Sequence, residues 1–315
     1  MKNLIKIMTS LAISFCLIAT ISVVAFAEDV AERELDINTK GSIIIDYCYN
    51  DTPLNDIEFR VYQITSLDED ANHVLNSKYS EVELDYDLMY ESEYWLAFRD
   101  NLQNYINYEM IEPEFVFYTD NAGAYHLEDL ELGVYYIEAE TSVENELTIF
   151  SEPILITVGS YEESNELWVY HYTVQPKVAV LDDETYNITV EKIWENTNSE
   201  LLIPEEITVE LNRNGELFDV VVLNEENKWS YTWFDVDPCD CWAIKELDKL
   251  DDFVVNYEKD ILSFTITNTY IGEEDEELPQ TGTFAYLVPL MSSLGLVLVL
   301  LGVLLKYKFR YKEND

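Results

Sequence analysis

The clearest fold signal in this chain is the stretch Asn187-Ile-Thr-Val-Glu-Lys-Ile-Trp194. Apolar and polar residues alternate along it, which is the pattern of a β-strand with one buried face. Because successive side chains of a strand point to opposite sides, that face carries Ile188, Val190, Lys192 and Trp194. The stretch therefore predicts a core strand with one lysine among its apolar residues.

Two later stretches repeat this arrangement with a different polar residue. The apolar face of residues 262–270 contains Asn268, and that of residues 241–246 contains Glu246. An unpaired charge in a protein core is costly even after its surroundings relax. We therefore expect Lys192, Glu246 and Asn268 to lie together in one core.

These three groups are able to react with one another. Burial favours the neutral amine of a lysine and the protonated form of a glutamate. The amine of Lys192 could then attack the side-chain amide of Asn268 while Glu246 polarises it, and ammonia would leave. The sequence thus predicts a Lys192–Asn268 isopeptide bond with Glu246 as its catalytic residue. The alternative is a buried salt bridge and a hydrogen bond without a covalent link.

Strand-like stretches recur along most of the chain, with turn residues between them. They favour an all-β fold of antiparallel, immunoglobulin-like sandwiches over a parallel α/β sheet. We predict two tandem sandwiches, at residues 38–178 and 186–271, joined by a short acidic linker at 179–185. In the first, we expect residues 154–158 to form the closing strand.

A helical insertion is predicted inside the first sandwich, between residues 91 and 107. Five apolar residues fall there at helical spacing: Trp95, Phe98, Leu102, Tyr105 and Ile106. We interpret this stripe as core packing against the sandwich and not as a ligand site.

The N-terminus has the features of a secretory signal peptide. Lys2 and Lys6 precede an apolar stretch that ends in Ala25-Phe26-Ala27. A charged start, an apolar centre and small residues at the cleavage site characterise such peptides, so we expect removal of residues 1–27. A permanent N-terminal anchor is the alternative, and the small residues Ala25 and Ala27 argue against it.

The C-terminus contains three parts in a definite order. The pentapeptide Leu278-Pro279-Gln280-Thr281-Gly282 is followed by an uncharged apolar run at 284–305 and then by a basic tail. The 22 residues of this run are enough for a helix to cross a hydrocarbon core of about 30 Å. The basic tail should stay cytoplasmic. The pentapeptide would then lie just outside the membrane, after an acidic linker at 272–277.

These C-terminal parts resemble the sorting signal of Gram-positive surface proteins, the LPXTG motif that sortase reads. The resemblance implies cleavage between Thr281 and Gly282. It also implies a new amide from Thr281 to the peptidoglycan cross-bridge or to another subunit. The chain would be held in the membrane before sorting and would afterwards be a secreted, covalently wall-anchored protein. An ordinary single-pass membrane anchor is the alternative.

The second predicted sandwich resembles a Cna B-type domain. The similarity is carried by Ile188-Thr-Val-Glu-Lys-Ile-Trp194, by Lys245-Glu246 and by Ile266-Thr-Asn-Thr-Tyr270. Such domains form the internal isopeptide bond described above, and Lys192, Glu246 and Asn268 match its three residues.

The first predicted sandwich is similar to the N-terminal domain of Gram-positive pilins, through stretches such as Gly133-Val-Tyr-Tyr-Ile-Glu138. Its sequence departs from the bond-forming pattern. Asp46 stands near the expected position of the lysine, and the segment 154–158 contains no asparagine. We predict no isopeptide bond here and a structural role for Glu140, which could match the catalytic glutamate.

The segment Trp168-Val-Tyr-His-Tyr-Thr-Val-Gln-Pro-Lys177 resembles the pilin motif W-x-x-x-V-x-V-Y-P-K, although Tyr172 and Gln175 replace the usual valine and tyrosine. In shaft pilins the final lysine attacks the sortase-held threonine of the next subunit, which implies this role for Lys177. Pro176 should end the strand and leave Lys177 within reach of an enzyme. A solvated linker lysine is the alternative.

Composition excludes several classes of function. With 18 basic and 63 acidic residues and a net charge of −45, the chain is not expected to bind nucleic acid. The acidic clusters lack the spacing of a calcium loop, so we expect no metal and no cofactor. Cys16 would leave with the signal peptide, and Cys48, Cys239 and Cys241 form no disulfide framework. A bridge from Cys48 to one of the other two stays open.

The chain also lacks the motifs of a hydrolase. Its three histidines, His73, His126 and His171, form no metal-binding pair, and no nucleophile elbow is present. The self-directed isopeptide reaction aside, we expect no enzyme.

These features together predict a wall-anchored pilin subunit, a structural and adhesive component of a surface fibre. Its expected partners are sortase, the peptidoglycan cross-bridge and other pilin subunits, and a host or matrix ligand is a further candidate. A shaft subunit would use Lys177 and Thr281, whereas a base subunit would use chiefly Thr281. The alternative is a stand-alone LPXTG-anchored adhesin that binds a host or matrix ligand without polymerising.

Overall fold

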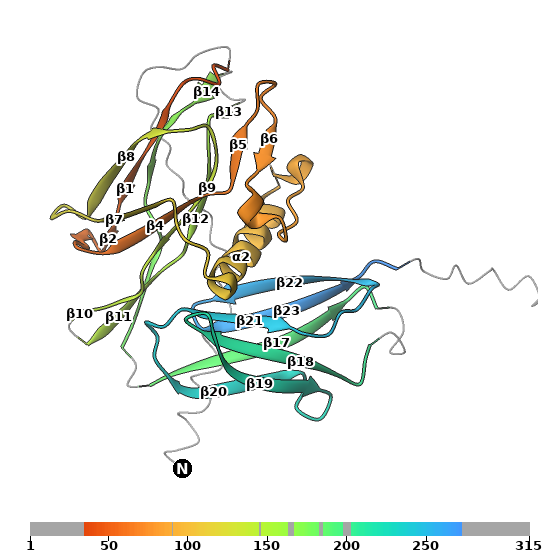
Figure 1. Cartoon of the computed structure of the whole chain (residues 1–315). Helices are drawn as coiled ribbons and strands as arrows, with labels where there is room; N and C mark the ends of the chain where they lie inside the picture. Colours follow the sequence, from red (N-terminus) through yellow and green to blue (C-terminus); the bar gives the residue numbers. More distant parts are fainter. Residues whose placement is uncertain are drawn as a thin grey trace, which may run out of the picture. The chain divides into compact units, whose positions relative to one another are not determined.

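The computed structural model describes residues 35–89, 91–144, 146–162, 167–182, 185–197 and 203–272. The predicted signal peptide with Ala25 and Ala27, the motif at 278–282, the helix at 284–305 and most of the acidic linker at 272–277 lie outside these ranges. Within them, no helix is long and apolar enough to span a membrane. All the strands belong to one compact unit that ends at Tyr270 (Figure 1).

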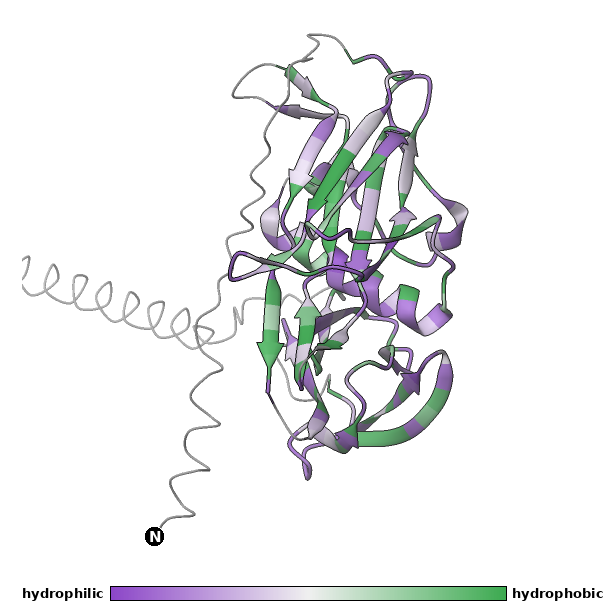
Figure 2. Ribbon diagram, turned by 90° about the vertical axis from the view of Figure 1, so that its left-hand side faces the viewer, coloured by the Kyte–Doolittle hydropathy of each residue, from purple (hydrophilic) through white to green (hydrophobic). Residues whose placement is uncertain are grey.

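The first sandwich packs a three-stranded sheet against a four-stranded sheet. The first sheet has the order β15 (His171–Val174), β1 (Gly41–Asp46), β8 (Ala124–Leu130). The second has the order β12 (Ile154–Val158), β9 (Gly133–Ala139), β4 (Glu58–Gln63), β7 (Phe115–Tyr118). The core between them includes Ile43, Ile45 and Phe59. The alternation of apolar and polar residues seen in the sequence follows the strands (Figure 2).

Short elements complete this half of the molecule. They are β2 (Cys48–Tyr49), β3 (Thr52–Pro53), β5 (Thr65–Leu67), β6 (His73–Leu75), β13 (Ser160–Glu162), β14 (Leu167–Val169) and the 3-10 turns η1 (Ser77–Tyr79) and η2 (Tyr86–Leu88). The predicted helical insertion is confirmed as α2 (Ser92–Glu109).

Helix α2 buries the predicted apolar stripe against the outer face of the sheet that contains β4 and β9. Phe98, Leu102 and Ile106 pack there with Tyr62 and Tyr136, and they form a second apolar cluster. Met110, in the left-handed conformation, ends the helix, and its N–H bonds back to Ile106. The interpretation of the stripe as core packing is therefore confirmed.

The second sandwich also consists of a four-stranded and a three-stranded sheet. The first has the order β20 (Ser230–Val236), β17 (Tyr186–Glu195), β23 (Ser263–Tyr270), β22 (Phe253–Asp260). The second has the order β19 (Glu216–Asn224), β18 (Glu206–Arg213), β21 (Trp242–Glu246). Ile188, Val190 and Trp242 are among the residues of its core. The all-β prediction with two immunoglobulin-like sandwiches is confirmed.

The expectation of antiparallel sheets needs one correction. In each sandwich the first strand pairs in parallel with the last strand of the same sheet, β1 with β15 and β17 with β23. The closing strand of the first sandwich is therefore β15 and not the expected segment 154–158, which forms β12 at the edge of the opposite sheet. A parallel pair brings residues from the two ends of a sandwich into lateral register.

The expected linker at 179–185 is in part a strand. Residues Val178–Leu181 form β16, which pairs with β11 (Leu147–Ser151), and β11 pairs with β10 (Ser142–Glu144). Val178 and Val180 pack on the core of the first sandwich, whereas Ala179 and Leu181 pack on that of the second. Alternate side chains of β16 thus pack on the two cores, and the strand connects them.

Candidate functional site

Three strands of the second sandwich bring the predicted site residues together. Lys192 lies on β17, Asn268 on the parallel neighbour β23 and Glu246 on β21 of the facing sheet. In the parallel register Lys192 lies beside Ile266, and Asn268 lies beside Trp194. Each side chain points into the core, as the alternation predicted, and all three residues are buried.

The carboxylate of Glu246 lies between the other two groups. Its Oε1 is 2.8 Å from Asn268 Nδ2, and its Oε2 is 3.8 Å from Lys192 Nζ. The ammonium nitrogen also donates to main-chain carbonyls of both strands, at 3.0 Å to Ile193 O and 3.4 Å to Ile266 O. The lysine is therefore oriented by the backbone of the first and the last strand together.

Burial changes the protonation of this pair. The side chains of Lys192 and Glu246 are 0% and 1% exposed. Burial lowers the pKa of Lys192 to about 8 although the neighbouring carboxylate opposes the change, and burial raises the pKa of Glu246. At neutral pH about one amine in ten is then uncharged, far more than for a solvated lysine.

The polar groups of the site are incompletely satisfied. Glu246 Oε2 and Asn268 Oδ1 are buried without a hydrogen-bond partner among the described residues. Unpaired polar atoms of this kind are costly in a core. The Asn268 amide could also turn by half a rotation, so that a protonated Glu246 donates to its oxygen.

Aromatic residues close the outer end of the site. Lys192 Nζ lies 4.0 Å from the ring centre of Trp194, which packs edge-on against Trp229 and Phe253 at 5.4 Å each. These rings keep water from the amine and so support the lowered pKa of Lys192.

The first sandwich carries different residues at the same register positions. The N–H of Lys192 donates to the carbonyl oxygen of Trp229, the residue just before β20. In the first sandwich, the N–H of Tyr47 makes the corresponding bond to the carbonyl oxygen of Gly123, the residue just before β8. The backbone register also aligns Ala139, opposite Phe59, with Glu246. Buried Tyr47 and small Ala139 thus stand where the second sandwich has its lysine and glutamate.

The last strand of the first sandwich does not reach the position of Asn268. Strand β15 ends at Val174, as the prediction for Pro176 implied, and the chain then turns to form β16 beside β11. Counted along the chain, Val178 would take the place of Asn268. None of these three residues offers an amine, a carboxyl or an amide side chain, in agreement with the absence of the pattern noted in the sequence.

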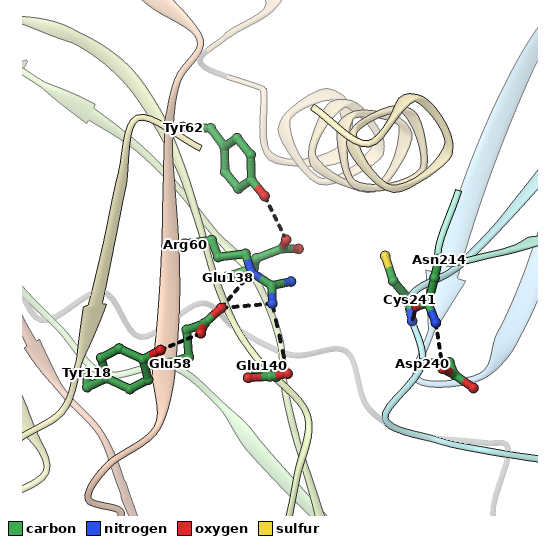
Figure 3. A network of polar contacts seen from close by, with 9 residues as sticks. All are labelled: Glu58, Arg60, Tyr62, Tyr118, Glu138, Glu140, Asn214, Asp240 and Cys241. Atoms are coloured by element: carbon green, nitrogen blue, oxygen red, sulfur yellow. Dashed lines mark hydrogen bonds and ion pairs between the residues drawn. The ribbon is translucent and has the colours of Figure 1, made fainter. Parts of the chain in front are cut away.

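The two first-sandwich residues considered from the sequence, Asp46 and Glu140, each lie one residue before or after the aligned position. Asp46 points away from the core and accepts a hydrogen bond from Gln175 Nε2 at 2.6 Å. Glu140 is 47% exposed and pairs with Arg60 at 3.9 Å. Figure 3 shows this second carboxylate in a network with Glu58 and Arg60, whose side chains are 19% and 33% exposed. The expectation of a structural role for Glu140 agrees with this contact.

Lys177 lies at the junction before β16, but its amine is less accessible than expected. The side chain is 34% exposed, whereas Nζ itself is shielded from solvent and makes no hydrogen bond to the described residues. Glu152 Oε2 lies 3.8 Å away and also pairs with Arg99 at 3.7 Å. An enzyme that uses this lysine must first displace it from Glu152.

The cysteines take no part in the site. Cys48, Cys239 and Cys241 are all free thiols, so the open possibility of a Cys48 bridge is not realised. Burial is the largest cause that raises the pKa of Cys241, to about 11, so this thiol stays protonated at neutral pH.

Comparison with known proteins finds relatives of the second sandwich. Residues 188–269 match the family model of the Cna protein B-type domain. The collagen adhesin of Staphylococcus aureus is 34% identical over 92 residues, which make up 29% of this chain and 8% of that protein. This chain therefore spans only a small part of its curated relative. The region with Lys192, Glu246 and Asn268 is therefore similar to Cna B-type domains.

Solved structures of surface proteins are also similar, at low identity. A single B repeat unit of the collagen-binding protein of Staphylococcus aureus is 15% identical, and the match covers 74% of this chain and all of that one, with a TM-score of 0.27. The major pilin SpaD of Corynebacterium diphtheriae is 12% identical over 76% of this chain and 66% of that one, with a TM-score of 0.32. The shaft pilin SpaA of Lactobacillus rhamnosus GG is 11% identical over 75% of this chain and 100% of that one, with a TM-score of 0.26.

Proposed function

We propose that the chain is a wall-anchored pilin subunit whose second sandwich is cross-braced by a Lys192–Asn268 isopeptide bond. The observation that carries the proposal is the burial of Lys192, Glu246 and Asn268 in contact, on the first strand, a facing strand and the last strand of a Cna B-type domain. Burying three polar side chains in one apolar core costs stability, and a cross-link between two of them would offset that cost.

The reaction needs no reagent from outside the domain. The neutral amine of Lys192 attacks the side-chain carbon of Asn268, and a protonated Glu246 hydrogen-bonds the amide oxygen as negative charge develops there. Glu246 then carries a proton from the attacking nitrogen to the departing NH2 group, and one ammonia leaves. One C–N bond forms and one breaks. Because folding already holds the reacting groups in contact, they do not have to meet by diffusion. This proximity can lower the reaction barrier by about 7–11 kcal/mol.

The bond would change how the domain responds to force. The chain enters the second sandwich at β17 and leaves it at β23, so tension pulls on these two strands. Without a covalent link, the force acts on the hydrogen bonds of the parallel β17–β23 pair. An amide between Lys192 and Asn268 carries the force directly from strand to strand, and the sandwich stays folded.

Attachment and polymerisation rest on the sequence motifs. In this proposal sortase cleaves after Thr281 and joins it to the peptidoglycan cross-bridge or to Lys177 of another subunit. Export through the signal peptide at 1–27 and retention by the helix at 284–305 bring the chain to that enzyme. Lys177 takes part after its ion pair with Glu152 has opened.

Co-expression with a sortase in a Gram-positive host tests this function. We expect ladders of high-mass species on denaturing gels and a wall fraction released only by digestion of peptidoglycan. Thr281→Ala should abolish both, and Lys177→Ala should abolish the ladders alone, whereas Lys40→Ala on the exposed surface serves as the control. Ladders that persist in Lys177→Ala would exclude this lysine as the polymerising residue.

A stand-alone wall-anchored adhesin is the second candidate, and the shielded amine of Lys177 favours it. Such a protein would be found in the wall fraction as a single band, with no ladder in the presence of any sortase of the host. Binding of the purified chain to immobilised matrix proteins would then identify its ligand class.

A further inference from the structure

Helix α2 belongs to the first sandwich, but one of its faces contacts the second. It packs against β21 and β22, which are the edge strands on the same side of the two facing sheets. Asn101, Asn104 and Tyr108 lie on this face at helical spacing. The polar face of α2 therefore bridges the two sheets of the second sandwich.

Asn104 takes the place of a pairing strand at the edge of β21. Its Nδ2 donates to Ile244 O at 2.8 Å, and its Oδ1 accepts from Ile244 N–H at 2.9 Å. Both bonds are buried, so they satisfy the two main-chain groups that an edge strand would otherwise leave open. In the first sandwich the corresponding edge of β9 is paired by strand β12.

Asn101 makes the matching contact at the edge of β22. Its Oδ1 accepts from Tyr257 N–H at 2.7 Å, and its Nδ2 donates to Asn256 Oδ1 at 3.1 Å. Farther along the helix, Tyr108 Oη donates to Glu210 Oε2 at 2.8 Å. Two asparagines one helical turn apart thus hold one strand from each sheet.

The strands held by α2 are the ones that set the position of Glu246. This residue lies two positions after Ile244 on β21, and its N–H donates to Tyr257 Oη at 3.1 Å. Tyr257 lies in register with Ile266 on β23, two residues before Asn268. The contacts therefore run from Asn101 through Tyr257 to Glu246, and from Glu246 to Asn268.

We propose that Asn101 and Asn104 are positioning residues for the isopeptide reaction of the second sandwich. By holding β21 and β22 together, α2 keeps Glu246 at the distance from which it reaches both Lys192 and Asn268. The inference rests on the proposed function. It adds that the second sandwich cross-links only after the first has folded and docked, which is the order in which the chain is exported.

The rate of cross-linking tests this inference. Residues 28–277 are synthesised in a cell-free system, and the fraction of chains lighter by one ammonia is followed over time by intact mass. We expect Asn104→Leu and Asn101→Leu to react about 10- to 100-fold more slowly than the parent, since a small misplacement of reacting groups has effects of that size. Asn101→Asp keeps the acceptor for Tyr257 N–H and should restore most of the rate.

Tyr105→Phe is the matched control on the same helix. It removes one hydrogen bond, from Tyr105 Oη to Lys78 O, which lies within the first sandwich, and it should react at the parent rate. Protease resistance of each variant reports whether it has folded. The inference is overturned if folded Asn101→Leu and Asn104→Leu react as fast as the parent. A parent chain that never loses ammonia overturns the proposed function, and this inference with it.

Discussion

The two sandwiches share one strand arrangement and differ in what fills it. In both, the first strand lies beside the last strand in parallel. The facing sheet contributes an equivalent strand, β9 in the first sandwich and β21 in the second. The second has Lys192, Glu246 and Asn268 at three positions where the first has Tyr47, Ala139 and a strand that has already turned away. The fold alone therefore does not specify a cross-link.

The difference follows the path of the chain. In the first sandwich the segment after β15 is used for β16, whose side chains pack on both cores. A bond at that point would compete with the connection between the sandwiches. In the second sandwich the last strand, β23, continues beside β17 to Tyr270 and so includes Asn268.

Removal of the lysine should have the largest effect on stability, because the second sandwich would then lack a cross-link, as the first does. Lys192→Met prevents the bond without leaving a buried charge. The bond closes a loop of about 77 residues, which by chain entropy corresponds to about 4–5 kcal/mol of stability. We expect intact mass to show that no ammonia is lost. In calorimetry, we expect the unfolding midpoint to be lower by about 20 °C.

Tyr47→Phe is the control at the equivalent position of the first sandwich. It removes only a hydroxyl group from a buried ring, so its expected cost is about 1 kcal/mol, and the loss of ammonia should be unchanged. Equal effects of the two substitutions would contradict the difference between the sandwiches.

The pH dependence of cross-linking further distinguishes the two sandwiches, because only the second has a titrating pair at these positions. The reactive form needs a neutral Lys192 and a protonated Glu246. With the lysine pKa lowered to about 8 and the glutamate pKa raised, this form becomes more abundant with rising pH up to the glutamate pKa. It then stays level to about pH 8 and declines above.

The rate of ammonia loss, measured by mass after synthesis at different pH values, should follow this profile. We expect about a tenfold decrease for each pH unit above 8. A rate that keeps rising with pH through 9 and 10 would show that Glu246 does not act as an acid.

The smallest expected effect is in the chemical labelling of Lys177. This measurement tests whether the first sandwich has a lysine amine accessible to other molecules. Because its amine is shielded beside Glu152, we expect it to acylate several-fold more slowly than exposed Lys40 in mass-spectrometric labelling. Glu152→Ala should raise its labelling toward that of Lys40. Labelling of Lys177 at the rate of Lys40 in the parent protein would show that the amine is freely exposed.

Much of the second sandwich was predictable from sequence because its polar residues interrupt clear alternation. Ile188, Val190 and Lys192 are buried as predicted, and the site residues are in contact. Strand β22 was missed, since its residues are mostly half-buried and alternate weakly. Its importance became evident only from the contact of Tyr257 with Glu246.

The first sandwich was harder to interpret for a physical reason. Side-chain periodicity shows which residues share a face, but it does not show which strand pairs with which. The choice of residues 154–158 as the closing strand was wrong, and Asp46 and Glu140 were each one residue away from the aligned positions. The buried polar face of α2 was missed too, because Asn101 and Asn104 read as solvated residues on an amphipathic helix.

We propose that the second sandwich carries an amide bond between Lys192 and Asn268 and that the first sandwich has no such bond. Intact mass of recombinant residues 28–277, followed by peptide mapping, measures this directly. We predict a mass lower by one ammonia and a single branched peptide that joins the segments around Lys192 and Asn268. A mass without the loss of ammonia, or a branch within residues 35–182, would show that the bond is absent or lies in the other sandwich.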